Sequence, residues 1–216
     1  MAETVTLADA APIATEIGAV IIENQGLLSE IDGATGDGDH GINMAKGFRL
    51  ANERLGKKSF DLREGFATIG DTLLGDIGGS MGPLYGSFFT DMADSLEGSD
   101  KLDRDNFAAM LTAGEAGVVD LGEAKVGDKT LIDVLVPARD AFAAAAKDGK
   151  DFAASLEALK AASAEGLEST RDMVAKLGRA ARLGERSRGT LDAGACSANL
   201  ILQALADGLL KRLHAA

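Results

Sequence analysis

The 216-residue chain contains one cysteine, no tryptophan, one tyrosine and eight phenylalanines. The single cysteine, Cys196, cannot form an internal disulfide, and we interpret it as a small packing residue of a helix. The shortage of tyrosine and tryptophan removes most of the platforms on which single-stranded nucleic acids stack. These absences argue against a disulfide framework and against a binder of single-stranded nucleic acid.

Basic residues and long apolar runs are scarce as well. The chain has 22 Lys and Arg against 34 Asp and Glu, a net charge of −12, which disfavours contact with a phosphate backbone. No run approaches the roughly 18 apolar residues of a membrane span, and the first residues are acidic where a signal peptide is basic. We therefore expect a cytoplasmic protein. Because the chain is acidic, we also expect it to bind any anionic ligand together with metal ions that offset the negative charge.

Apolar residues recur at helical spacing along most of the chain, beginning with Ile13, Ile17, Val20 and Ile21. The pattern predicts eight helices, near residues 6–25, 41–56, 61–76, 80–95, 103–121, 128–148, 151–178 and 193–213. The connections between them are short, which implies antiparallel neighbours. We expect residues 1–216 to form one all-α domain, an up-and-down antiparallel bundle, with no strand.

Glycine is abundant for a helical protein, with 27 residues. Because glycine costs about 1 kcal/mol relative to alanine inside a helix, a helical fold should confine it to turns. The glycines concentrate near 33–41, 75–86, 122–127, 178–189 and 194, at predicted helix boundaries. Helix capping explains any one of them, but the density near Asp37 favours loops that converge on a ligand.

Three aspartates, Asp32, Asp37 and Asp39, lie in one glycine-rich stretch. Carboxylates this close repel one another unless folding separates them or a cation bridges them. Oxygen ligands without sulfur favour Mg²⁺ or Ca²⁺, and Mg²⁺ is commonly shared with phosphate oxygens. The cluster indicates a nucleotide-phosphate site, although helix caps and Asx-turns remain an alternative from the residues alone.

Two familiar motifs do not fit the same stretch. Residues 36–41 match the dinucleotide pattern GxGxxG, but no strand precedes them, and Asp37 and Asp39 would face a pyrophosphate without a counterion. An EF-hand loop starting at Asp37 would need glutamate at its twelfth position, which is Phe48. Neither a Rossmann site nor an EF-hand is therefore expected.

Other polar residues have more than one interpretation. His40 could be a metal ligand, an acid–base group or an ordinary first-turn residue. Asp128 is expected to cap the next helix, in preference to a phosphate contact by Lys129. The arginines at 179, 182, 186 and 188 form a basic patch suited to phosphate, to an acidic partner or to solvent. The segment 192–194 opens the last helix, whose N-terminus can receive an anion or a ribose.

The chain resembles the ADP-binding L subunit of dihydroxyacetone kinase and the matching C-terminal domain of single-chain dihydroxyacetone kinases. The resemblance rests on four stretches in the same order, at residues 28–41, 78–86, 127–137 and 178–194. It implies an eight-helix barrel with the nucleotide at one end, and two Mg²⁺ ions held by Asp32, Asp37 and Asp39. The residues that it places around ADP or ATP are His40, Gly41, Ile42, Asn43, Ser80, Met81, Gly122, Thr130, Leu131, Arg179, Asp192, Ala193 and Gly194.

Two positions depart from the family pattern. Ser80 and Met81 stand where the family often has Ala-Ser or Thr-Ser, so the hydroxyl contact shifts to Ser80. Ala193 replaces a common proline, and the lost constraint is of the order of 0.4–1 kcal/mol.

The resemblance also implies partners. In the family the ketone is bound by a separate K subunit, and in the phosphotransferase-system version a phosphohistidine M subunit rephosphorylates bound ADP. In the other version ATP binds, reacts and leaves. A chain of this length favours the multi-subunit arrangement. Open alternatives are another small ketose such as erythrulose, a lipid-like acyl substrate, a non-catalytic role with a transcriptional regulator, and a homodimer.

Overall fold

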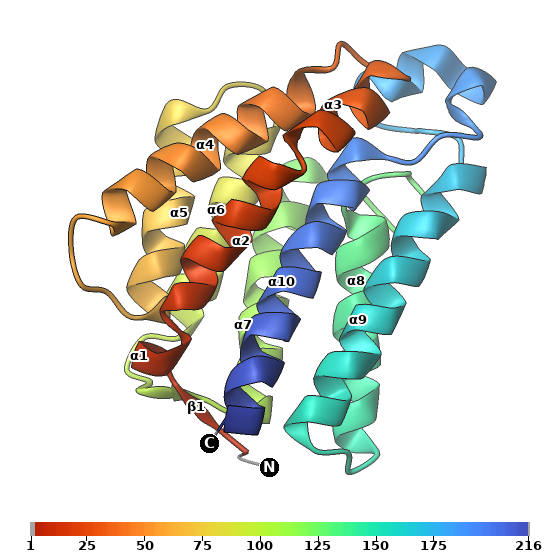
Figure 1. Ribbon diagram of the computed structural model, residues 1–216. Coiled ribbons are helices and arrows are strands. Elements are labelled where there is room, and N and C mark those ends of the chain that lie inside the picture. The colour runs from red at the N-terminus through yellow and green to blue at the C-terminus, as the bar shows by residue number, and fades with distance from the viewer. Residues whose placement is uncertain (1–2, 216) are drawn as a thin grey trace.

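The computed structural model describes residues 3–215 and is built almost entirely of helices (Figure 1). Ten α-helices, two 3-10 segments and two very short strands make up the described chain. In order these are β1 (Val5–Thr6), α1 (Leu7–Ala10), α2 (Pro12–Glu23), α3 (Gln25–Gly33), α4 (Asp39–Leu55), α5 (Leu62–Asp76), α6 (Met81–Ser95), β2 (Lys101–Leu102), α7 (Arg104–Gly122), α8 (Ile132–Lys147), α9 (Phe152–Ser169), η1 (Thr170–Asp172), η2 (Ala180–Ser187) and α10 (Ala193–Ala215).

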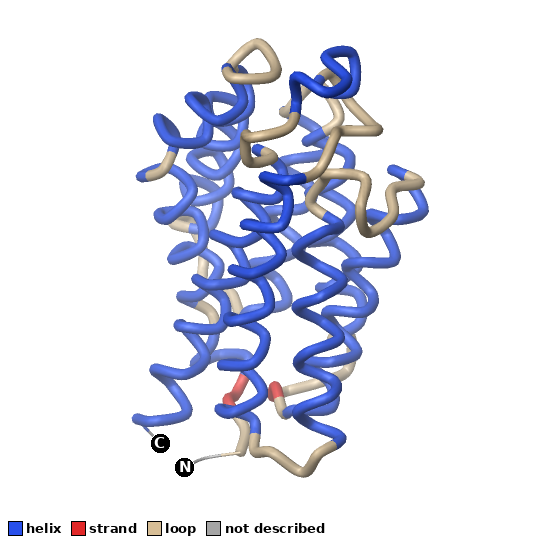
Figure 2. Tube along the Cα trace, turned by 90° about the vertical axis from the view of Figure 1, so that its right-hand side faces the viewer, coloured by secondary structure: helices blue, strands red, loops and turns tan. Residues whose placement is uncertain are grey.

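The eight longest helices form a closed ring. Each of α2, α4, α5, α6, α7, α8, α9 and α10 packs against the next along the chain, and α10 packs back against α2. Figure 2 shows them aligned along one axis with loops at the two ends. The all-α, up-and-down barrel expected from the sequence is confirmed. Because neighbours alternate in direction, the N-termini of α4, α6, α8 and α10 lie at one end, which we call the site end.

Helix capping differs between the two ends. Three of the four helices that begin at the far end, α5, α7 and α9, are capped by the side chains of Asp61, Asp103 and Asp151, whereas α2 begins at Pro12 without a side-chain cap. At the site end the N-cap residues of α4, α6 and α8, which are Gly38, Ser80 and Leu131, make no side-chain cap. Neighbouring side chains accept from one N–H in two of these first turns: Asp32 from His40 in α4 and Thr130 from Ile132 in α8. An uncapped helix start leaves backbone N–H groups unpaired and carries the positive end of the helix dipole. The site end can therefore receive an anion.

The interior of the barrel is apolar and aromatic. Phe89 contacts Phe48, Phe66 and Phe88, with ring centroids 5.4–5.8 Å apart. A second group, Phe107, Phe142 and Phe152, packs on the α7–α9 side. Burial of such side chains contributes about 1.5–3 kcal/mol each, so this core holds the helix ends at fixed positions.

Two predicted helix boundaries are wrong. The segment predicted at 6–25 divides, because Pro12 starts α2 without an N–H to donate and Asn24 separates α2 from α3. The segment predicted at 151–178 ends at Ser169, and Met173 is extended. The chain then forms the 3-10 segment η2 within the arginine-rich region.

A short antiparallel pair was not expected. β1 pairs with β2 through Val5 with Leu102 and Thr6 with Lys101, at the far end. It ties the first residues of the described chain to the loop before α7. Among the described residues one helix, α10, is long and apolar enough to cross a membrane, but 67% of its most apolar window is buried. It is a wall of the barrel, in contact with α2 and α9.

Glycines are not confined to turns, contrary to expectation. Many lie inside helices where a neighbouring helix comes close, at positions 18, 47, 65, 70, 82, 86, 114, 117, 166 and 208. At Gly166 in α9, an added Cβ would lie 2.3 Å from the Asp133 carbonyl oxygen of α8. Close helix packing therefore offsets the conformational cost of these glycines.

This packing predicts opposite effects for two glycine substitutions. Gly166→Ala should lower the free energy of unfolding by about 1–3 kcal/mol, because backbone atoms of α8 must move. Gly75→Ala, where an added Cβ meets open space, should be neutral or stabilising by up to about 1 kcal/mol. Urea unfolding followed by circular dichroism measures both. Equal destabilisation of the two variants would contradict the close α8–α9 contact.

Candidate functional site

The three aspartates lie at the site end, in and around the α3–α4 connection. Asp32 belongs to the last turn of α3, and its Oδ2 accepts a hydrogen bond from the backbone N–H of His40 at 3.2 Å. Asp37 is in the connecting turn and Asp39 is the first residue of α4; both are exposed. The turn folds back on Asp32, since the Gly36 N–H donates to the Asp32 carbonyl oxygen at 2.6 Å.

A cation already neutralises part of this cluster. The Arg179 guanidinium forms an ion pair with the carboxylate of Asp37, which brings the segment before η2 over the aspartate turn. Within residues 3–215, no group of three or more His, Cys, Asp or Glu side chains converges as a metal site. Asp32 faces the start of α4 while Asp37 faces Arg179, so the trio shares one region without meeting at one point.

Beneath the aspartates, a buried polar network joins three helices. His40 Nε2 of α4 lies 2.9 Å from Ser197 Oγ of α10, and Ser197 Oγ lies 2.6 Å from the Tyr85 hydroxyl of α6. Tyr85 also donates to the Gly194 carbonyl oxygen at 2.9 Å. Burial lowers the pKa of His40 to about 4, although Asp32 opposes the shift. The imidazole is therefore neutral near pH 7 and links helices without adding positive charge.

The start of α10 is held by Asp192. Its carboxylate accepts a hydrogen bond from the Ala195 N–H at 2.7 Å, which is an N-cap contact. Burial raises the pKa of Asp192 to about 6; the bond from Ala195 and the nearby Lys129 cation lower it. The carboxylate of Asp192 therefore caps α10, and Ala193 and Gly194 form the first turn of that helix.

The turn before α8 has a different structure from the one expected. Asp128 does not cap α8: it accepts from the Lys125 N–H at 2.9 Å and pairs with Lys176 at 3.0 Å. Asp133 builds the turn instead, accepting from the backbone N–H groups of Gly127 at 2.5 Å and Thr130 at 2.7 Å. Lys129, the alternative phosphate contact, is 1% exposed and points into the protein. Neither residue has the role considered from the sequence.

The remaining predicted residues all lie at the site end, although few touch one another. His40, Gly41, Ile42 and Asn43 form the first turn of α4; Ser80 and Met81 open α6. Gly122 ends α7, and Thr130 and Leu131 precede α8. A Cβ added at Gly194 would lie 3.6 Å from the Leu131 N atom, so the starts of α8 and α10 are adjacent.

Three buried polar residues of this region were missed as functional candidates: Tyr85, Asp133 and Ser197. Tyr85 is the only tyrosine and lies inside one of the four matching stretches, a signal that could have been used. Asp133 likewise lies inside a matching stretch, 127–137, whereas Ser197 lies outside all four and carries no such signal. Cys196 is buried as expected, and burial raises its thiol pKa to about 11.

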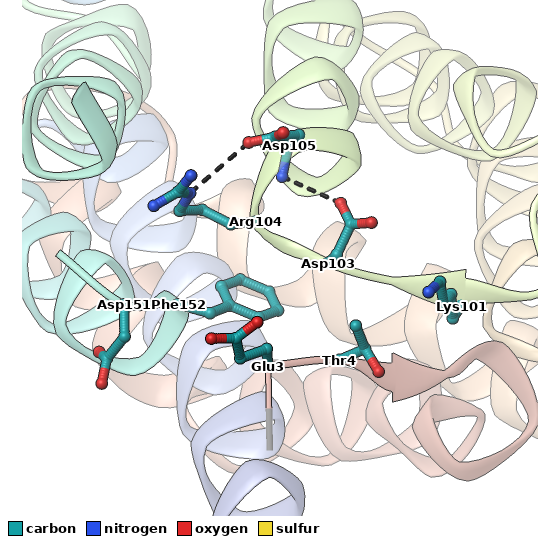
Figure 3. Close-up of a pocket in the computed structure, with 8 residues that line it drawn as sticks. All are labelled: Glu3, Thr4, Lys101, Asp103, Arg104, Asp105, Asp151 and Phe152. Carbon is teal, nitrogen blue, oxygen red and sulfur yellow. Dashed lines mark hydrogen bonds and ion pairs between the residues drawn. The ribbon is translucent and has the colours of Figure 1, made fainter. Parts of the chain in front are cut away.

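A cavity of about 370 Å³ lies at the far end, away from every predicted residue (Figure 3). It is lined by Glu3, Thr4, Lys101, Asp103, Arg104, Asp105, Asp151 and Phe152. Arg104 and Asp105 form an ion pair at 3.5 Å, and Asp103 caps α7. These polar groups are engaged in ion pairing and capping, and the cavity is not part of the candidate site.

The fold and the site end together define the class of this protein as an all-α helix barrel with an acidic turn and four helix N-termini at one end. Residues 34–207 match the family model described as the DAK2 domain, and the chain belongs to that family. It is 39% identical over 191 residues to a Listeria innocua protein named PEP-dependent dihydroxyacetone kinase 1, ADP-binding subunit DhaL, covering 88% of this chain and 90% of that protein.

Two further similarities extend this finding. The dihydroxyacetone kinase from C. freundii, crystallised with AMP-PNP and Mg²⁺, superimposes with a TM-score of 0.67 at 28% identity, over 92% of this chain and 33% of that one. A Mycolicibacterium smegmatis protein named L-erythrulose 1-kinase is 35% identical over 196 residues, which cover 89% of this chain and 34% of that protein. The similarity thus includes whole proteins of this length and parts of longer kinases.

The raised pKa of Asp192 predicts a pH-dependent stability difference. In the unfolded chain this carboxyl group loses its proton near pH 3.8, but in the folded protein only near pH 6. Its contribution to the free energy of unfolding therefore falls as pH rises through that window. Asp192→Asn keeps an oxygen acceptor for Ala195 and removes the titration. Relative to wild type, the variant should gain roughly 1–2 kcal/mol between pH 4 and pH 7.

Urea unfolding of both proteins across this pH range, without nucleotide, measures the difference directly. Only the difference is diagnostic, because other carboxyl groups titrate in both proteins. A difference that stays constant from pH 4 to pH 7 would contradict the burial of a titrating Asp192.

Proposed function

We propose that this protein is the nucleotide-binding, phosphoryl-donating subunit of a dihydroxyacetone kinase. The single observation that supports this most is the coincidence, at one end of the barrel, of three aspartates and three helix N-termini whose N-cap residues make no side-chain cap. Helix starts bind phosphate oxygens, and aspartates bind the cations that accompany them. The DAK2 family membership and the names of the relatives supply the reaction class.

Asp32, Asp37 and Asp39 are the residues that would hold Mg²⁺, and we propose two ions. The residues fit this group in two respects: the donors are all carboxylate oxygens, and one of them already binds a cationic side chain, Arg179. A Cβ at Gly36 would lie 2.6 Å from Asp32 Oδ1, so a side chain there would displace the carboxylate of Asp32. When bound, Mg²⁺ neutralises charge on the phosphate oxygens.

The protein's own groups have separate roles in this proposal. Backbone N–H groups at the starts of α4 and α6 bind phosphates, with Ser80 as the hydroxyl contact. Arg179, which is 61% exposed in its side chain, is free to turn from Asp37 toward a phosphate. Gly122, Thr130 and Leu131 line the nucleotide, and residues 192–194 face its sugar and base. Positioning and charge compensation are the main requirements of phosphoryl transfer.

We further propose that ADP stays bound and is rephosphorylated by a phosphohistidine M subunit, in the cytoplasm. The support is the similarity, along nearly the whole chain, to a subunit named PEP-dependent and ADP-binding. The alternative is exchange of ATP in a kinase for another ketose, which the similarity to part of an L-erythrulose kinase favours. We also propose that residues 1–216 act as one unit.

Loss of one carboxylate should abolish tight nucleotide binding. Wild-type protein purified without added nucleotide is expected to carry ADP and Mg²⁺ in native mass spectrometry, whereas Asp37→Asn and Asp39→Asn should carry none. In calorimetric titration with ADP and Mg²⁺, each variant should bind at least about tenfold more weakly, a loss of roughly 1.4 kcal/mol. The matched control is Asp105→Asn, whose side chain is 88% exposed at the far end.

Each outcome separates the two parts of the proposal. Wild-type affinity in Asp37→Asn or Asp39→Asn would overturn the metal assignment. An empty wild-type protein that nevertheless binds ADP and Mg²⁺ in calorimetry would overturn the bound-cofactor mode and favour exchange. Weakened binding in Asp105→Asn would mean that the substitutions act through global stability.

The site end also carries the features of a docking surface. The exposed large apolar side chains of the described residues all lie there: Leu27, Ile42, Leu74, Leu121, Val126 and Leu177. Exposed apolar residues gathered around a polar site mark protein contacts. We propose that the substrate-binding K subunit covers this end, so that the ketone meets the nucleotide across the interface.

A charge placed in this surface should impair docking alone. Leu121, which is 57% exposed on α7, becomes charged in Leu121→Asp, and desolvating that charge should weaken binding of the K subunit at least about tenfold. ADP and Mg²⁺ affinity should stay within about twofold. Ala109→Asp, an exposed position nearer the far end of α7, is the control. Surface plasmon resonance with the K subunit measures the effect, and equal affinities in all three proteins would contradict the proposal.

A further inference from the structure

Lys129 is a buried cation with an unusual backbone. Its side chain is 1% exposed, and its φ of 61° lies in the left-handed region, which residues other than glycine seldom adopt. Its turn is fixed by Asp133, which accepts from the Gly127 and Thr130 N–H groups on either side. Backbone strain of this kind persists only where surrounding contacts impose it. The turn therefore aims one particular side chain inward.

The ammonium group of Lys129 is solvated by backbone oxygens from a distant part of the chain. Nζ donates to the carbonyl oxygens of Ser187 at 2.5 Å, Thr190 at 2.6 Å and Met173 at 3.3 Å. Among residues 3–215, no carboxylate forms an ion pair with Lys129, and Asp192 acts on it only at longer range. An ammonium group loses its hydrating water when it is buried, and here three carbonyl oxygens take the place of that water.

These three acceptors belong to the segment 173–190, which contains η2 and little apolar core. Ser187 closes the segment locally, accepting from the Ala175 N–H at 2.9 Å and donating to the Gly184 carbonyl oxygen at 2.7 Å. Outside the segment, its polar anchors besides Lys129 are Asp37, Asp128 and residues 170–172. Lys129 alone contacts both ends, near Met173 and near Thr190.

The segment carries Arg179, which pairs with Asp37 of the aspartate turn. The segment is thus held at the site by the exposed ion pair of Arg179 with Asp37, and beneath it by the buried cation of Lys129. An exposed ion pair is screened by solvent and contributes little, whereas hydrogen bonds to a buried charge are stronger. Of the two, the buried contact decides where the segment lies.

We propose that Lys129 is a positioning residue that fixes the segment 173–190, and with it Arg179, over the aspartate turn. It acts through the carbonyl groups of Met173, Ser187 and Thr190 and touches no phosphate. The role of Arg179 toward nucleotide rests on the proposed function, whereas the placement of the segment does not.

Trypsin tests the placement without nucleotide, because the segment contains the arginines 179, 182, 186 and 188. Lys129→Met keeps the length of the side chain and removes its donors. Cleavage within 179–188 should become at least about tenfold faster than in wild type, since local opening exposes these bonds. The control, Lys176→Met, removes the exposed ion pair with Asp128 in the same segment and should change the rate by less than about twofold.

Rescue by an amine separates a positioning role from simple filling of space. Lys129→Ala lacks the three methylenes and the ammonium that n-propylammonium supplies. This cation should restore slow cleavage relative to Lys176→Met in the same solution, a comparison that cancels its competition with lysine and arginine side chains for trypsin, and 1-propanol of similar size should not. The test applies even if Lys129→Met unfolds, because the added amine is present during refolding. Equal rescue by both compounds, or cleavage of Lys129→Met at the wild-type rate, would overturn the proposal.

Nucleotide binding gives an independent second readout. In Lys129→Met, the dissociation constant for ADP with Mg²⁺ should rise about five- to tenfold. In a protein that already carries Arg179→Met, adding Lys129→Met should raise the dissociation constant much less. Fully additive losses in the double variant would overturn the link from Lys129 to Arg179. A wild-type protein that binds no ADP would contradict the proposed function, while the trypsin result would still decide the placement of the segment.

Discussion

Closure of the helix ring, through the contact of α10 with α2, is the constraint on which the site depends. A closed ring of eight antiparallel helices must place four N-termini at each end. At the far end, aspartate caps satisfy the N–H groups of α5, α7 and α9. At the site end the N-cap residues of α4, α6 and α8 make no side-chain cap, and the partial positive charge of those helix starts is available to a ligand.

An acidic protein can then hold an anion because charge is arranged locally. The net charge of −12 repels phosphate over the surface as a whole, yet the site end combines helix dipoles, Arg179 and carboxylates able to bind cations. The buried His40 stays neutral and ties α4 to α10 through Ser197, which keeps two of the helix starts in register. Rigid helices position the site, and the segment 173–190 closes over it.

Buried hydrogen bonds join the helices, turns and loops at the site end. Tyr85, Ser197 and His40 connect α6, α10 and α4; Asp133 shapes the turn before α8; Lys129 holds the segment that follows η1. Each pairs a buried polar atom with a backbone or side-chain partner from another element, and leaving such an atom unpaired costs about 1–3 kcal/mol. The site end is therefore specified by hydrogen bonds, whereas the middle of the barrel is specified by apolar packing.

The sequence by itself determined the all-α class and the antiparallel order of the long helices, because helical periodicity and short connections are local signals. Most of the residues that gather at one end were predicted through the resemblance of four stretches to a known family. The division of 6–25 has a local cause in Pro12, whereas the early end of α9 at Ser169 and the glycines inside helices were decided by tertiary structure. In each case a partner far along the chain competes with local preference: the carbonyl of Met173 turns to Lys129, and Gly166 admits the backbone of α8. No local pattern encodes such a partner, since the contact exists only once the ring has closed.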